Sequence, residues 1–194
     1  LHCRKLDADC PFDVSGFTFA GMPGVVIGHN RRVAWGFSNL APDVTDLYLE
    51  KVSGQRYLAG GRWEPLGLRD EIIRVHGEEP RTLTVRTTRH GPLLSDVSRE
   101  LSSVGANAAV PTGSPERGNG YGVALAWTAL EPTSTADAIF ALNTAGNWEA
   151  FRSAAKLFAV PAQNMLYADV DGDIGYQAPG RIPIRKPGHS GDDP

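Results

Sequence analysis

The sequence predicts an α+β fold that is mainly antiparallel β, with two helices near residues 135–158. Short apolar and β-branched segments, separated by Gly, Pro and Asn, fill the chain from Phe12 to about Leu130. Helical spacing of apolar residues appears only after that region, and strand-like segments return behind it. Strands, then helices, then strands favour helices that cover one face of an antiparallel sheet.

The first clear element is a hairpin within Pro23–Glu50. Val25 to Ile27 and Val33 to Phe37 are strand-like, and the segment between them, residues 28–32, has the composition of a turn. Four more segments read as strands: Thr45 to Val52, Arg69 to Val75, Arg81 to Thr88 and Val123 to Thr128. Residues 101–122 are rich in Ser, Gly, Ala, Asn and Pro, which predicts a long loop.

Two helices follow in the second half. Ser134 starts the first, whose apolar residues recur at helical intervals until Gly146 stops it. Asn147 is the expected N-cap of the second, which ends before Pro161. A second hairpin is then expected around Asp171-Gly172, followed by an extended, Pro-rich tail over residues 179–194.

Composition narrows the class of protein. A chain of 194 residues with 41% hydrophobic content is long enough for one domain with a core. Its 19 basic and 22 acidic residues form no basic stripe for nucleic acid, and no apolar run is long enough to cross a membrane. Cys3 and Cys10 cannot build a zinc site of paired CxxC motifs, and their spacing leaves both a disulfide and two free thiols open.

Several short motifs lie in order across nearly the whole chain. They are Pro23-Gly24, Gly28-His29-Asn30, Ala34-Trp35-Gly36, Asp43 with Asp46-Leu47-Tyr48, His90-Gly91-Pro92, Ala126-Trp127-Thr128, and Gln163-Asn164 with Tyr167-Ala168-Asp169. Together they resemble the penicillin acylase family, whose members are N-terminal nucleophile hydrolases that cleave amide bonds. The resemblance implies an αββα sandwich, of which residues 1–194 supply one partial domain from the β subunit.

The family's nucleophile is the N-terminal Ser, Thr or Cys of the β subunit, and its own α-amino group serves as the base. Residue 1 is Leu, and only 22 residues precede Pro23-Gly24. We therefore expect the nucleophile to lie outside this chain, which would be inactive alone. The resemblance implies the α subunit and the rest of the β subunit as partners, a small amide as substrate, and a periplasmic or extracellular location.

The resemblance also implies which residues support the transition state. Asn164 stands where the family has its side-chain oxyanion donor, and Asn39 where a backbone N–H is the second donor. Arg185 matches an arginine that holds the site together from outside. The alternatives are an Asn that satisfies a loop, a plain strand exit and a solvated basic residue in the tail.

Ile27 and Phe37 match positions that line the acyl pocket in penicillin G acylase-type members. Those members have an aromatic residue at the first position and a small one at the second, and the sizes are reversed here. This departure makes an aliphatic or differently shaped acyl group as plausible as a phenylacetyl-like one. Both residues could instead belong to the core of the hairpin.

The same resemblance implies a structural calcium ion and no catalytic cofactor. Its ligands would be Asp43, the carbonyl of Thr45, Asp46 and Asp169, which offer oxygen atoms of the kind that calcium prefers. A solvated polar loop is the alternative. The five histidines show no metal-binding spacing, and a triad of His90, Ser95 and Asp96 has only adjacency in its favour.

Three functions are therefore open at this point. The first is part of an amide hydrolase that acts on β-lactams, acyl-homoserine lactones or related N-acyl compounds. The second is a β-rich binding module that has kept the fold without catalysis. The third is a calcium-stabilised surface module.

Overall fold

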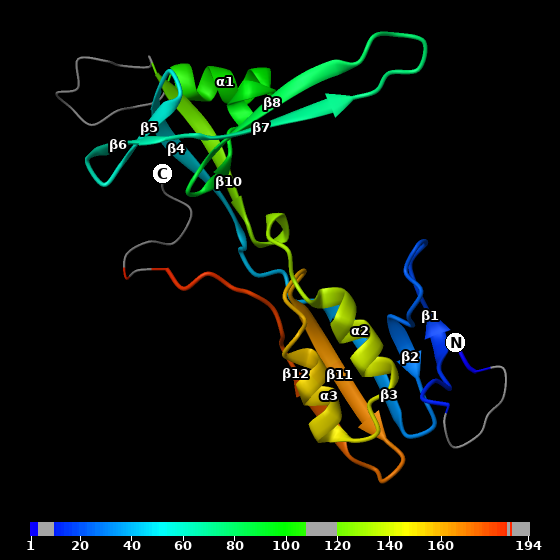
Figure 1. Ribbon diagram of the computed structural model, residues 1–194. Coiled ribbons are helices and arrows are strands. Elements are labelled where there is room, and N and C mark those ends of the chain that lie inside the picture. Colours follow the sequence, from blue (N-terminus) through cyan, green and yellow to red (C-terminus); the bar gives the residue numbers. More distant parts are fainter. Residues whose placement is uncertain (4–9, 108–119, 186, 188–194) are drawn as a thin grey trace. The chain divides into compact units, whose positions relative to one another are not determined.

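The computed structural model describes residues 1–3, 10–107, 120–185 and 187 (Figure 1). The chain divides into two compact units: Leu1–Val44 with Glu131–Ile184, and Thr45–Leu130 with Arg185–Pro194. Each unit is described by itself. That residues 1–194 form one partial domain of a larger protein stays a prediction.

A five-stranded antiparallel sheet forms the first unit. Its strand order is β1-β2-β3-β11-β12, so β3 pairs with a strand more than a hundred residues later in the chain. The strands are β1 (Ser15–Phe17), β2 (Ile27–His29), β3 (Val33–Asn39), β11 (Gln163–Asp169) and β12 (Ile174–Gln177).

Both hairpins predicted from the sequence are confirmed in this sheet. Asn30 closes the turn between β2 and β3, because its Oδ1 accepts hydrogen bonds from the backbone N–H groups of Arg32 (2.9 Å) and Val33 (2.8 Å). Asp171-Gly172 lies in the turn between β11 and β12, as expected, and Gly172 has a φ of 93°. Such a φ favours glycine over any residue with a Cβ.

The helices α2 (Thr135–Asn143) and α3 (Trp148–Ala155) cover one face of the sheet (Figure 1). Both were predicted, and Asn147 caps α3 as expected, since its Oδ1 accepts the N–H of Ala150 at 2.9 Å. Alternate residues of the strands face the helices and form the core of this unit. The core contains Val33, Trp35, Met165 and Tyr167 from the strands and Ile139, Leu142, Phe151 and Ala154 from the helices.

The other face of the sheet carries the intervening residues. We call it the open face; its members include Ile27, Ser38, Asn164, Leu166, Ile174 and Tyr176. Three of them are large apolar or aromatic residues with much of their surface exposed: Leu166 is 56% exposed, Tyr176 51% and Ile174 87%. An antiparallel sheet with apolar residues on both faces is typical of a middle layer in a sandwich.

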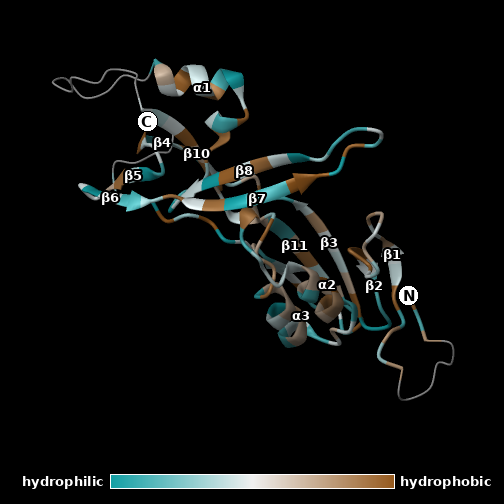
Figure 2. Ribbon diagram, turned by 45° about the horizontal axis from the view of Figure 1, so that its top comes forward, coloured by the Kyte–Doolittle hydropathy of each residue, from teal (hydrophilic) through white to brown (hydrophobic). Residues whose placement is uncertain are grey.

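The second unit contains two antiparallel sheets. The first has the strand order β10-β4-β5-β6 and the second the order β7-β8-β9. The strands are β4 (Thr45–Ser53), β5 (Arg56–Ala59), β6 (Arg62–Pro65), β7 (Gly67–Ile73), β8 (Arg81–Thr88), β9 (Gly91–Pro92) and β10 (Tyr121–Trp127). Hydrophilic and hydrophobic residues are mixed along β7 and β8, as the sequence predicted for β8 (Figure 2). A small core forms around Tyr57, Leu66, Leu93 and Ala124.

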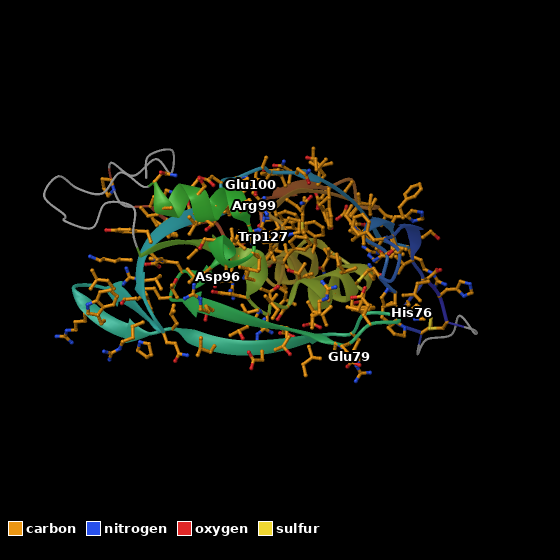
Figure 3. The ribbon with its side chains drawn as sticks, turned by 90° about the horizontal axis from the view of Figure 1, so that it is seen from above. His76, Glu79, Asp96, Arg99, Glu100 and Trp127 are labelled. Atoms are coloured by element: carbon orange, nitrogen blue, oxygen red, sulfur yellow. A yellow bond between two sulfur atoms is a disulfide. The ribbon has the colours of Figure 1, made fainter. Side chains whose placement is uncertain are left out.

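One prediction for this unit was wrong in part. Residues 101–122 were expected to form a loop, but Arg99–Ala106 form helix α1, and its first residues Arg99 and Glu100 are labelled in Figure 3. The helix forms because Ser98 is its N-cap: the Ser98 Oγ accepts the N–H of Leu101 at 3.2 Å. The segment 108–119 of the predicted loop lies outside the described residues.

The two chain ends were predicted with different success. Cys3 and Cys10 form a disulfide, the pairing that the sequence left open. Residues 179–185 of the predicted tail contain no helix or strand, and most of the segment beyond them lies outside the described residues.

Candidate active site

Asn164 and Asn39 lie together at one end of the five-stranded sheet. Asn164 is in β11, opposite Ser38 of β3, and its side chain is on the open face. Its Nδ2 donates hydrogen bonds to the backbone carbonyl of Asn39 (3.1 Å) and to the Oγ of Ser38 (3.2 Å). Asn164 and Asn39, which are 125 residues apart in the sequence, therefore meet at the end of β3.

The backbone N–H of Asn39 points away from β11. On the β11 side, the N–H of Leu40 donates to the carbonyl of Ala162 (3.3 Å), and successive N–H groups of a strand point to opposite edges. The N–H of Gln163, opposite Asn39, agrees with this pattern, because it donates to Pro179 on the far side of β11. On the other edge of β3, the described pairing with β2 reaches only Ala34 and Trp35.

This geometry suits the stabilisation of an oxyanion. A backbone N–H and a side-chain amide N–H, both on rigid strands, are donors whose orientation is set before a substrate binds. Asn164 is further held by Tyr176, whose hydroxyl donates to the Asn164 Oδ1 at 2.5 Å. Tyr176 was not predicted from the sequence. The short turn of the expected second hairpin could have indicated it, because that turn places Tyr176 opposite Leu166 and diagonal to Asn164.

The two predicted pocket residues do not lie on the same face. Phe37 alternates with Trp35 and faces the helices, where its ring meets Phe158 edge to face with centroids 5.7 Å apart. Ile27 precedes Gly28, which pairs with Trp35, so Ile27 is on the open face. That both line one pocket stays a prediction: Phe37 is partly buried against the core, and Ile27 shares a face with Asn164.

Arg185 binds Asp46 within the second unit. Its Nη2 donates to both carboxylate oxygens, at 2.7 and 2.9 Å, and both side chains are about four-fifths buried. A paired, largely buried carboxylate and guanidinium form a stable contact between the tail and the start of β4. Arg185 therefore has a structural partner, and its role toward the oxyanion donors stays a prediction.

The role of Asp169 as a calcium ligand stays a prediction. Asp169 pairs with Val33 at the start of β3, whereas Asp43 follows the end of that strand at Asn39. The strand from Val33 to Asn39 spans about 20 Å, and Asp43 lies four residues beyond its end.

The oxygens of Asp169 organise the β11–β12 turn. Its Oδ2 accepts the hydroxyl of Tyr167 (2.6 Å), and its Oδ1 accepts the N–H groups of Asp171 and Asp173 (3.0 Å each). The hydrogen bond from Tyr167 and those from the backbone hold the pKa of Asp169 below its ordinary value. Burial, with the Asp169 contact, raises the pKa of Tyr167 to about 12, so its hydroxyl stays protonated.

The other predicted ligands do not form a metal site in the part of the chain that the structure describes. No three His, Cys, Asp or Glu side chains come together there as a group that could hold an ion. Asp43 belongs to the first unit and Thr45 and Asp46 to the second, where Asp46 already contacts a cation, Arg185. The contacts of the described residues therefore do not show a calcium site.

His90, Ser95 and Asp96, which are adjacent enough in the sequence to suggest a catalytic triad, do not form one. The Nδ1 of His90 contacts Glu50 (2.7 Å), the Oγ of Ser95 accepts the N–H of Val123 (3.0 Å), and Asp96, labelled in Figure 3, accepts two hydrogen bonds from Arg86. Each side chain has its own partner, so this cluster stabilises the second unit.

The family model described as penicillin amidase matches residues 1–194, the whole chain. The chain belongs to the penicillin amidase family. An acyl-homoserine lactone acylase, QuiP, from Pseudomonas fluorescens Pf-5 is 36% identical over 181 residues, which cover 91% of this chain and 20% of that protein. Penicillin G acylase from Escherichia coli is 30% identical over 92% of this chain and 19% of its own length.

Solved structures agree with the family assignment. A thermostable penicillin G acylase from Alcaligenes faecalis superimposes with a TM-score of 0.68 at 26% identity, over 92% of this chain and 29% of that chain. The predicted mainly antiparallel α+β fold, as part of an N-terminal nucleophile hydrolase, is confirmed. This family chain spans about a fifth of the length of the curated relatives it matches. None of its described helices is long and apolar enough to cross a membrane.

Proposed function

We propose that this chain is the oxyanion-stabilising part of an acylase that hydrolyses N-acyl amides. The observation that carries the proposal is the meeting of Asn164 and Asn39 at the end of β3. The nucleophile, the N-terminal Ser, Thr or Cys of a mature β subunit, attacks the amide carbonyl carbon. The carbonyl oxygen gains negative charge, which the Nδ2 of Asn164 and the N–H of Asn39 stabilise.

Substrate class follows from the relatives and from the open face. The relatives are named as acylases of acyl-homoserine lactones and of penicillin G, which share an amide between an acyl group and a polar amine portion. Ile27 is the one predicted pocket residue on the face of Asn164. An aliphatic side chain there favours an acyl chain that packs without an aromatic partner.

The proposed partner is the rest of the same precursor. Leu166, Tyr176 and Ile174 expose apolar surface on the open face, beside the proposed donor Asn164. A second layer that covers this surface would also exclude water from the donors, which strengthens their interaction with an oxyanion. We propose that the α subunit and the remaining β-subunit residues supply that layer.

The Cys3–Cys10 disulfide supports an oxidising location, the periplasm or the exterior of the cell. A structural calcium ion is not part of the proposal, because Arg185 already neutralises Asp46 and Asp169 is used by a turn. No chemical step depends on an ion.

The test replaces Asn164 in the complete enzyme. We expect Asn164→Ala to lower kcat on the order of 10² or more, with little change in melting temperature. Asn147→Ala is the matched control, since it removes an N-cap on the helix-covered face; it should cost about 1 kcal/mol of stability and leave kcat unchanged. Normal turnover by Asn164→Ala would contradict the proposal, whereas no turnover by the complete parent protein would favour a binding module.

A further inference from the structure

Tyr176 makes a hydrogen bond whose role the proposed chemistry does not yet include. Its hydroxyl donates to the Oδ1 of Asn164 at 2.5 Å across the β11–β12 pair. Leu166 is directly opposite Tyr176, and Asn164 is two residues further along β11, so both side chains are on the open face. A diagonal neighbour at this spacing is within reach of a long aromatic side chain.

The contact fixes which way the amide of Asn164 points. A side-chain amide can turn over and exchange its oxygen and nitrogen, and its partners decide between the two orientations. The carbonyl of Asn39 only accepts hydrogen bonds, so the amide nitrogen must face it. The hydroxyl of Tyr176 donates to the amide oxygen and so adds a second hydrogen bond to the orientation that the Asn39 carbonyl selects.

That orientation is the one that an oxyanion donor needs. The amide nitrogen has two hydrogens, one toward the carbonyl of Asn39 and one toward the Oγ of Ser38. The Ser38 hydroxyl rotates freely about its Cβ–Oγ bond, so its 3.2 Å contact is easily exchanged for a stronger charged acceptor. The turned-over amide would instead present its oxygen, which repels an oxyanion.

We propose that Tyr176 is a positioning residue that holds the amide of Asn164 with its N–H groups toward the oxyanion. The inference rests on the proposed function, because it deepens the role of Asn164. The hydroxyl of Tyr176 acts through Asn164 and donates no hydrogen bond to the substrate itself.

Tyr176 is not part of the helix-covered core of this sheet. Tyr176 is 51% exposed in this chain. Tyr167, on the neighbouring strand β11 and on the opposite face of the sheet, is 3% exposed. Tyr167 packs against Trp148 and Phe151 and bonds Asp169. The two tyrosines therefore form a matched pair: each has one hydroxyl bond, on opposite faces of one sheet.

The experiment compares Tyr176→Phe, Tyr167→Phe, Asn164→Ala and the double variant Tyr176→Phe/Asn164→Ala in the complete enzyme. We expect Tyr176→Phe to lower kcat about 10-fold with KM nearly unchanged, as for a donor held in a poorer geometry. Tyr167→Phe should leave kcat unchanged. In the Asn164→Ala background, Tyr176→Phe should change kcat by less than about twofold, since a residue that acts through another has nothing left to position.

Inhibitor binding gives a second readout that a structural role would not move. An alkylboronic acid forms a tetrahedral adduct with the nucleophile and carries an oxygen in the oxyanion position. We expect Tyr176→Phe to weaken this inhibitor about 10-fold and to leave the affinity for the free carboxylic acid product unchanged. The melting temperature of Tyr176→Phe should match that of the parent enzyme.

The outcomes separate the two proposals. If Asn164→Ala loses turnover but Tyr176→Phe keeps normal kcat and inhibitor affinity, the positioning role is wrong and the proposed function stands. If the losses of the two single variants multiply in the double variant, Tyr176 acts independently of Asn164 and the inference is likewise overturned. If Asn164→Ala keeps its turnover, the proposed function itself fails.

Discussion

Asn143, the last residue of α2, exchanges two hydrogen bonds with the backbone of Val25. Its Oδ1 accepts the Val25 N–H at 2.8 Å, and its Nδ2 donates to the Val25 carbonyl at 2.7 Å. The side chain is 1% exposed. A single buried amide therefore completes the backbone pairing of the chain just before β2 and fastens it to the helical layer.

Removing this amide should destabilise the first unit strongly. We expect Asn143→Ala to cost about 3 kcal/mol, because it leaves a buried N–H and a buried carbonyl of Val25 without partners. Thermal melting or urea unfolding measures the loss. Thr144→Ala, an exposed neighbour at the end of the same helix, should change stability by less than about 0.5 kcal/mol. Equal stabilities of the two variants would show that the Asn143 contacts are replaceable by water.

Gly175 of β12 leaves room for the ring of Trp148. A Cβ at this position would lie 2.4 to 2.9 Å from three ring atoms of Trp148. We expect Gly175→Ala to lower stability by about 1–3 kcal/mol, as overpacking does. Gly146 is the control, because a Cβ there meets nothing within 4 Å. The prediction is wrong if both alanine variants melt at the same temperature.

Asp169 should make stability depend on acid pH. Its folded pKa lies below the ordinary value of 3.8, because Tyr167 and backbone N–H groups bond the carboxylate. The folded state therefore favours the charged form, and this stabilisation is present above pH 4 and is lost as pH falls through the folded pKa. We expect Asp169→Asn to lower the melting temperature at pH 7, with the difference narrowing below about pH 4. A difference that stays constant with pH would rule out the carboxylate charge as its cause.

Calcium should have no effect on stability at Asp46. Its two carboxylate oxygens contact Arg185, so the negative charge is already balanced. We expect the melting temperature of the complete enzyme to be the same with calcium chloride and with a chelator. Asp46→Asn should lower it in both conditions by the same amount, through the loss of the ion pair. Stabilisation by calcium that disappears in Asp46→Asn would show a metal site that the ion pair conceals.

The strands and helices with a regular period were predictable from the sequence. The β2–β3 hairpin, β8 and the α3 cap at Asn147 follow from local composition and short-range spacing, which need no tertiary contact. Helix α1 was missed because it is short and rich in small and polar residues, although Ser98 as N-cap and the apolar pair Leu101 and Val104 were a usable signal.

The candidate site was predictable in identity but not in geometry. Motif resemblance selected Asn164 and Asn39, yet their meeting depends on the pairing of β3 with β11, which local sequence does not determine. The face on which Phe37 lies was not predictable, because it depends on strand register, in which a shift of one residue exchanges the two faces. The contact of Tyr176 with Asn164 was not predicted, because it depends on the register of β11 and β12.

The register of β11 links the site to the core. Met165 and Tyr167 are buried under the helices, so Asn164, which directly precedes Met165, must face the other way. A shift of β11 by one residue would turn the amide of Asn164 toward the helices and place Met165 on the open face. The packing of Met165 and Tyr167 in the core thus determines the face of the sheet on which the polar side chain of Asn164 lies. We therefore expect substitutions at Met165 or Tyr167 that change this packing to reorient Asn164. Such substitutions would lower turnover in the complete protein although neither residue binds the substrate.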